Sequence, residues 1–250
     1  MMKTRNWTIL FLAGLFAVQS SHAAPAIKGG LQGAWARLTA TTGMEVKQVL
    51  LFSGEYFSWT EYQAANGAFL NTRGGSWKMT GSQLVFTFEF HSADSSQVGQ
   101  TEAWSWASEE AGLTLSPIEA GKPSLPGWKP IDAGQSTELT GPWLMAGRVR
   151  DGETSRRDTN VPRKTMKLLT GTRFQWIAYN TQTKQFLGTG GGTYTAQDGK
   201  YAESLEFFSR DNSRVGMRLE FSFGLPDGDW HHEGKSSAGE PMHEIWTRRL

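Results

Sequence analysis

Polar and aromatic side chains gather in the last third of the chain, in a pattern that suits recognition of a small molecule. They alternate along short apolar runs, so that they should face the interior of a sheet structure: Tyr194, Tyr201, Glu203, Trp230, His232, Glu244, Trp246 and Arg248. Small-molecule sites are typically apolar cavities with a few convergent polar groups. We therefore expect an aromatic-lined cup formed by these residues, with a small apolar or aromatic molecule as its ligand.

Glu203 is the most unusual member of this set, because an equivalent segment of the same chain has Phe86 in its place. An ionised carboxylate inside a barrel is costly unless it is paired, hydrogen-bonded or protonated. Glu203 is thus the one candidate catalytic residue, a general acid or base for an isomerase, hydratase or decarboxylase. The alternative is structural, with Glu203 bonded to Arg248 or to a tyrosine hydroxyl. The sequence favours neither, whereas for Glu244 and Arg248 individually we favour a structural role.

Two other patterns superficially resemble functional sites. His231 and His232 are adjacent on a predicted strand and point to opposite faces, so they cannot share one metal ion. Asp229, His231 and Glu233 do share a face, which a solvated strand surface explains better than a metal site. Residues 188–193 are rich in glycine, but the helix and the Lys-Ser/Thr pair of a phosphate-binding loop are missing. We expect these glycines at a bulge or sharp bend, and we predict neither a metal nor a cofactor.

An internal repeat defines the elements that must position the candidate site. Residues 51–99 align with residues 168–216 without a gap, at a constant offset of 117. Seventeen positions are identical: Leu51, Gly54, Phe57, Trp59, Tyr62, Phe69, Leu70, Thr72, Gly74, Gly75, Glu89, Phe90, Ser92, Asp94, Ser96, Val98 and Gly99. A repeat of this length is a duplicated domain rather than a solenoid unit. Aromatic residues that recur in both copies are predicted to be core, and those in one copy only, such as Trp230 and Trp246, are better candidates for a ligand wall.

Both copies are predicted to consist of short antiparallel strands. Leu84, Phe86, Phe88 and Phe90 alternate with polar or smaller residues, which is the period of a strand with one apolar face. Turn signals such as Asp198-Gly199 separate the runs. We predict an all-β fold of two tandem small antiparallel up-and-down β-barrels, at residues 24–116 and 139–250. Residues 117–138 hold four prolines and three glycines and are predicted to be an extended linker.

The ends of each copy carry a family resemblance. Gly141-Pro142-Trp143 opens the second copy and Arg248 lies near its end, whereas the first copy has Gly33-Ala34-Trp35 and no arginine in its Leu113–Pro117 segment. This pairing resembles the lipocalin-like (calycin) barrels, in which the tryptophan closes one end and the arginine packs across it. The whole chain is similar to duplicated lipocalin-like secreted bacterial proteins of unestablished function. The resemblance implies the fold and small-molecule binding; a carbohydrate-binding module with exposed tryptophans, or a purely structural protein, are the alternatives.

The N-terminus and the composition indicate where the protein acts. Lys3 and Arg5 precede 12 apolar residues at 7–18, which is shorter than the roughly 20 residues of a membrane span. We predict a signal peptide over residues 1–23, cleavage after Ala23, and a periplasmic or extracellular protein with no membrane span. The chain has no cysteine, which excludes a disulfide framework and a lipoprotein anchor. Removing Lys3 and Arg5 leaves 23 basic against 24 acidic residues, a poor match to nucleic acid. The sequence predicts no oligomeric state.

Overall fold

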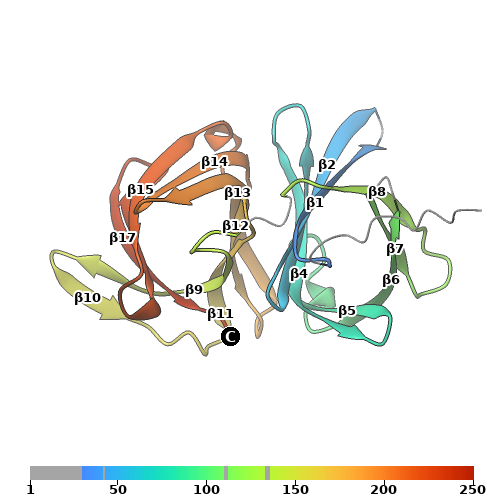
Figure 1. The fold of residues 1–250 in the computed structure, drawn as a ribbon, viewed down its shortest axis with the longest axis horizontal. Coiled ribbons are helices and arrows are strands. Elements are labelled where there is room, and N and C mark those ends of the chain that lie inside the picture. The colour runs from blue at the N-terminus through green and yellow to red at the C-terminus, as the bar shows by residue number, and fades with distance from the viewer. Residues whose placement is uncertain (1–29, 42, 110–111, 133–135) are drawn as a thin grey trace, which may run out of the picture.

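The computed structural model describes residues 30–41, 43–109, 112–132 and 136–250, which form two antiparallel barrels side by side (Figure 1). The predicted signal peptide and its cleavage site lie outside the described residues. Among the residues that are described, none belongs to a helix long and apolar enough to cross a membrane. The predicted all-β fold of two tandem up-and-down barrels is confirmed.

The first barrel is closed by eight strands in sequence order. Their bounds are β1 Gly33–Thr41, β2 Met44–Ser53, β3 Tyr56–Gln63, β4 Phe69–Thr80, β5 Gln83–His91, β6 Thr101–Glu109, β7 Gly112–Pro117 and β8 Leu125–Pro130. β8 closes the barrel by pairing with β1, where Trp35 faces Pro130. Residues 125–130, predicted to be part of the linker, thus belong to the first barrel. Their prolines and Gly127 hide the strand period, although Trp128 is fully buried in the core.

The second barrel repeats this order and adds one hairpin strand. Its strands are β9 Gly141–Arg150, β10 Glu153–Arg156, β11 Arg163–Leu169, β12 Arg173–Asn180, β13 Gln185–Gln197, β14 Lys200–Phe208, β15 Arg218–Gly224, β16 Trp230–Lys235 and β17 Pro241–Arg248. β17 pairs with β9 and closes the barrel, while β10 pairs with β9 alone and projects from one end (Figure 1). The described residues also include three short 3-10 helices, η1 Ser95–Gln97, η2 Asn212–Arg214 and η3 Pro226–Gly228.

Glycine bulges bend equivalent long strands in the two barrels. The register shifts between Gly74 and Gly75 in β4, and between Gly191 and Gly192 in β13. A Cβ on Gly75 or Gly192 would lie 2.1 or 2.0 Å from a backbone oxygen of the neighbouring strand. Only glycine fits there, which confirms the prediction that these residues form bulges rather than a phosphate-binding loop.

The two barrels contact each other through equivalent surfaces. The Tyr62 hydroxyl of the first barrel donates a hydrogen bond to the Glu206 carboxylate of the second, at 2.6 Å. In return, the Tyr179 hydroxyl of the second barrel donates to Glu89 of the first, at 2.5 Å. Tyr62 and Tyr179 are equivalent in the repeat, as are Glu89 and Glu206. The barrels therefore pack as a symmetric dimer would, with one patch used twice.

Cations complete both halves of this interface. Arg249 lies 2.7 Å from Glu89, while Lys47 and Arg173 lie 3.0 and 2.5 Å from Glu206. Burial opposes ionisation of Glu206, but Arg173, Tyr62 and Lys47 together hold its pKa below the usual range. Two apolar clusters that also draw on both barrels flank these ion pairs.

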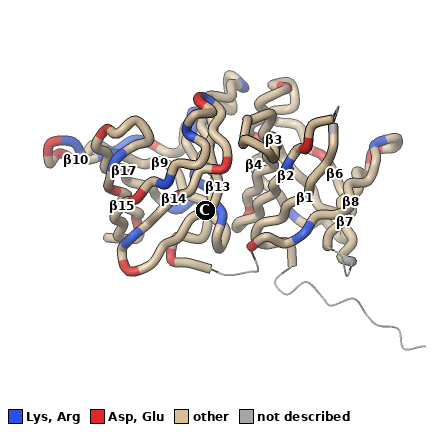
Figure 2. Tube along the Cα trace, turned by 90° about the horizontal axis from the view of Figure 1, so that it is seen from above, with Lys and Arg blue, Asp and Glu red and all other residues tan. Residues whose placement is uncertain are grey.

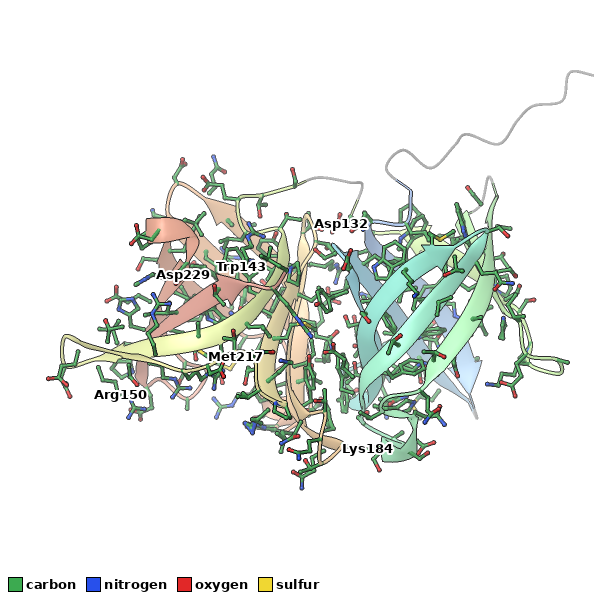
Figure 3. The ribbon with its side chains drawn as sticks, turned by 90° about the horizontal axis from the view of Figure 1, so that it is seen from below. Asp132, Trp143, Arg150, Lys184, Met217 and Asp229 are labelled. Carbon is green, nitrogen blue, oxygen red and sulfur yellow. The ribbon has the colours of Figure 1, made fainter. Side chains whose placement is uncertain are left out.

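The segment after β8 is fixed to the second barrel by Asp132. This buried carboxylate accepts hydrogen bonds from the Thr170 hydroxyl and the Thr172 amide in the β11–β12 turn, at the seam between the barrels (Figure 3). Elsewhere, the view in Figure 2 shows acidic and basic residues interspersed along both barrels.

Candidate functional site in the second barrel

At three buried interior positions the first barrel has an apolar side chain, whereas the second barrel has a lysine, a glutamate or a histidine. At the offset of 117, Leu50 is replaced by Lys167, Phe86 by Glu203 and Leu115 by His232. All three replacements are at most 4 % exposed. The second barrel thus carries charged and titratable groups where its duplicate has a hydrocarbon core. Lys167, Glu203 and His232 are called the floor below.

The floor is built around an ion pair between two buried side chains. The Lys167 ammonium lies 2.7 Å from the Glu203 carboxylate, which also accepts a hydrogen bond from the Tyr201 hydroxyl at 2.8 Å. The same ammonium lies 4.9 to 5.2 Å from the ring centres of Tyr201, Trp230 and Trp246, within the range of cation–π attraction. The partners of Glu203 are therefore a tyrosine, as one hypothesis held, and Lys167 in place of Arg248. Such pairing favours the structural interpretation of this carboxylate.

His232 has no hydrogen-bond partner, although its ring is 1 % exposed. Its Nδ1 atom is 3.6 Å from the Glu244 carboxylate, too far for a hydrogen bond, and its ring centre is 4.0 Å from that of Phe221. Burial, and then the charge of Lys167, hold the pKa of His232 well below its usual value. Burial also raises the pKa of Glu244. Buried polar atoms are nearly always bonded, so a neutral imidazole without a partner calls for a ligand or water.

A cavity of about 420 Å³ lies above the floor and opens at one end of the barrel. Its wall includes Trp176, Leu205, Phe221 and Trp246. The first barrel fills the corresponding space differently. There, Arg73 stands at the position of Gly190, and its guanidinium lies 4.2 Å from the centre of the Trp59 ring. In the second barrel the position is a glycine, and Trp176, the equivalent of Trp59, lines the cavity with the Arg210 guanidinium 5.6 Å from its ring centre.

Four arginines surround the open end, and none of them was predicted from the sequence: Arg148, Arg157, Arg163 and Arg210. The position of Arg163 follows from the strand order, since it begins β11 and Lys167 lies on the same face of that strand, four residues deeper in the barrel. We call these four residues the mouth arginines. A signal was present, because the basic loop around residues 148–158 is nine residues longer than its counterpart in the first copy. Lys167 was also identifiable, as a lysine aligned with Leu50.

The eight predicted site residues divide into three groups. Glu203, His232, Glu244 and Trp246 line the cavity. Tyr201 and Trp230 lie in the aromatic layer that contacts Lys167. Tyr194 and Arg248 lie at the closed end, where the Tyr194 hydroxyl donates to the Thr170 carbonyl at 2.5 Å.

The closed end has the tryptophan–arginine arrangement that the family resemblance implies. The Arg248 guanidinium lies 3.8 Å from the centre of the Trp143 ring and donates to the Glu138 carbonyl at 2.7 Å. Arg248 therefore seals the barrel at the end opposite the cavity. Trp246, regarded as unique to the second copy, has a counterpart, since Trp128 occupies the equivalent place in β8 opposite Leu113.

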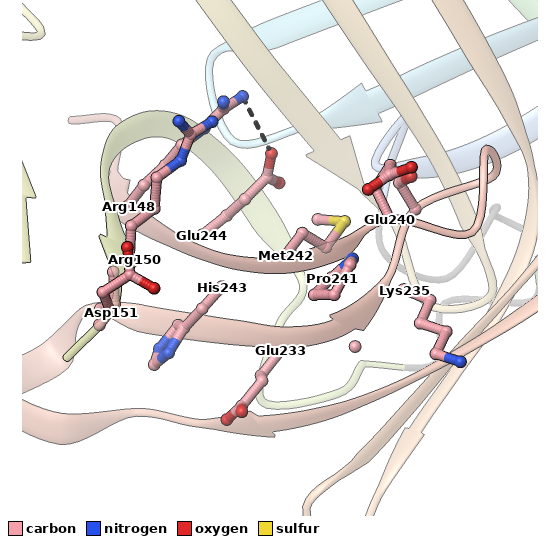
Figure 4. Close-up of a pocket in the computed structure, with 13 residues that line it drawn as sticks. Arg148, Arg150, Asp151, Glu233, Lys235, Glu240, Pro241, Met242, His243 and Glu244 are labelled. Atoms are coloured by element: carbon pink, nitrogen blue, oxygen red, sulfur yellow. Dashed lines mark ion pairs between the residues drawn. The ribbon is translucent and has the colours of Figure 1, made fainter.

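A groove of about 830 Å³ lies outside the barrel, between the β9–β10 and β16–β17 hairpins (Figure 4). Arg148 and Glu244 line both the groove and the inner cavity, and their charged groups are 3.6 Å apart. On the outer face, the His231 Nδ1 atom lies 2.9 Å from the His243 Nε2 atom. No group of three or more possible metal ligands occurs within the described part of the chain.

The fold and this site define a class: a tandem β-barrel protein in which one barrel has an apolar core and the other holds a cavity with ionisable groups at its floor. No family model matches the sequence, and no curated protein matches it. Among solved structures, the chain is similar to the uncharacterized protein YLR301w from Saccharomyces cerevisiae, with 10 % identity and a TM-score of 0.42. The similarity covers 87 % of this chain and 97 % of the yeast chain.

Proposed function

We propose that this protein is an exported, lipocalin-like carrier that binds a small molecule with an apolar or aromatic body in its second barrel. The observation that carries the proposal is His232, an unbonded and buried imidazole facing a cavity of about 420 Å³. A ligand with one polar group at its inner end would give His232 a partner once the neighbouring side chains shift, because neither ring nitrogen is exposed to the cavity. Its body would contact Trp176, Phe221 and Trp246, as expected for a small-molecule site.

The comparison between the barrels supports binding in the second one alone. In the first barrel, Leu50, Phe86 and Leu115 are fully buried in one apolar cluster. This barrel would act as a support, which holds the second barrel through the shared interface. The closed Trp143–Arg248 end supports the lipocalin-like assignment.

Two measurements test ligand binding. Mass spectrometry of the purified protein under native conditions should detect a bound small molecule. The neutral dye N-phenyl-1-naphthylamine, which fluoresces in apolar surroundings, should bind with a stoichiometry of one. The variant Leu205→Phe places in the second barrel the residue that the first has at Phe88, and should weaken dye binding at least tenfold. The reverse exchange, Phe88→Leu, is the matched control and should leave the affinity unchanged.

The proposal fails if the protein carries no small molecule and the dye does not bind. It also fails if Leu205→Phe and Phe88→Leu affect binding equally, because the dye would then not occupy the second barrel. Export has a separate test. Protein recovered from its native host should have the intact mass of a chain that begins at Ala24, and a retained N-terminus would contradict export with cleavage.

A further inference from the structure

The cavity carries an excess of positive charge. Its lining holds five cations, Lys167 and the four mouth arginines, against two carboxylates, Glu203 and Glu244, a surplus of three positive charges (5 − 2). His232 adds none, because burial and Lys167 keep it neutral. Glu203 is paired with Lys167 at the floor, so the surplus lies at the mouth.

Among Arg148, Arg157 and Arg163, only Arg148 has a carboxylate partner within the described part of the chain. Arg148 reaches Glu244 only at 3.6 Å, and the Arg157 guanidinium donates to the Met145 carbonyl at 2.6 Å rather than to an acid. Arg163 has no acidic partner among the described residues. Burial, followed by repulsion from Arg148 and Arg163, lowers the pKa of Arg157. Gathering like charges around one acid is unfavourable, and an anion placed among them would relieve it.

The geometry points to an organic anion as the ligand: we propose that an acid group binds Arg148, Arg157 and Arg163 while the apolar body enters the barrel. This inference rests on the proposed function and specifies the chemical class of the ligand. Guanidinium groups bind carboxylate, sulfonate or phosphate oxygens through paired N–H donors. The buried and unpartnered His232 marks the inner end of the site, and the arginines mark its outer end.

A pair of dyes with one body and different charge tests this inference. 8-Anilinonaphthalene-1-sulfonate has the ring system of N-phenyl-1-naphthylamine with a sulfonate added. The anionic dye should bind at least tenfold more tightly than the neutral dye, and salt should reduce this preference because it screens the arginines. The double variant Arg157→Gln/Arg163→Gln, which leaves Arg148 in place, should reduce the preference to less than threefold, because it weakens binding of the anionic dye much more than binding of the neutral dye.

Two further variants keep the test decisive. Arg150→Gln removes an exposed arginine of the outer groove only, and should leave the preference intact. Arg163→Gln alone alters an exposed residue at the start of β11 and should lower the preference about threefold even if the double variant does not fold. Equal binding of the two dyes to the unaltered protein would overturn the anion inference and leave the proposed function standing. Failure of both dyes to bind would overturn both.

Discussion

The Lys167–Glu203 pair permits a sharp test of the floor, because the first barrel supplies its apolar equivalent. The perturbation is a double-mutant cycle: Lys167→Leu, Glu203→Phe, and the two together. The double variant reproduces Leu50 and Phe86 of the first barrel at the equivalent places. Each single variant leaves one buried charge without its partner, in a site where the side chains are 5 and 6 % exposed.

The expected magnitudes follow from the geometry. At 2.7 Å, and with an effective dielectric constant of about 20, the attraction between the two charges is about 6 kcal/mol. Removing two ions from water costs several kcal/mol each, so the net contribution of the pair to stability is small. Each single variant should lower the free energy of unfolding by roughly 3–5 kcal/mol, since it leaves an uncompensated charge. The free energy of unfolding of the double variant should be equal to that of the unaltered protein or greater by up to about 4 kcal/mol.

Urea unfolding at pH 7, followed by circular dichroism and tryptophan fluorescence, measures these differences. The signature is non-additivity, because the single effects sum to roughly 6–10 kcal/mol and the double variant should lose none of it. If the double variant is destabilised by the sum of the single effects, the two charges do not compensate each other. A nearly neutral Lys167→Leu variant would equally refute a buried ion pair.

Four further predictions concern acid sensitivity, the role of Glu203, the barrel interface and the bulges. Unfolded histidine binds a proton near pH 6.5, but His232 in the folded protein does so only at much lower pH; stability should therefore fall, relative to a His232→Leu variant, as pH drops below about 6.5. Parallel stability–pH curves from urea titrations between pH 7.5 and 5 would contradict this. Glu203→Gln should lower the urea midpoint and leave N-phenyl-1-naphthylamine affinity intact; a lost affinity at unchanged stability would restore a functional role for this carboxylate. Tyr62→Phe and Tyr179→Phe should each lower the free energy of unfolding by a similar amount, about 1.5–3 kcal/mol, because each removes a hydrogen bond to a charged partner at equivalent places in the interface. An effect confined to one of the two variants would rule out the symmetric arrangement. Gly192→Ala should lower the free energy of unfolding, measured by thermal unfolding, by roughly 1–3 kcal/mol. The control Gly224→Ala should leave it unchanged, because the added methyl group meets nothing closer than 3.8 Å. Equal effects of the two variants would contradict the bulge argument.

The internal repeat is recognisable in the sequence, but the sequence shows only in part why each repeated residue recurs. Recurrence of a residue in both copies predicted a core position, and for Phe57 and Trp59 this is where the residue lies. Tyr62, Glu89 and Phe90 recur for another reason, since they build the surface through which the barrels meet. A core and a symmetric interface both bury their residues, so one sequence cannot separate them.

The sequence by itself determined the strands, the duplication, the bulge glycines and the Trp143–Arg248 closure, because these depend on local periodicity and on comparison of the two copies. It also placed Glu203 inside the barrel. The tertiary structure alone decided that Lys167 is the partner of Glu203, that β8 closes the first barrel and that arginines surround the mouth of the second. The physical reason is that alternation along a strand fixes which face a side chain occupies, whereas its partner comes from another strand. Register, closure and the path of the β9–β10 hairpin set that pairing, and they exist only once the barrel is complete.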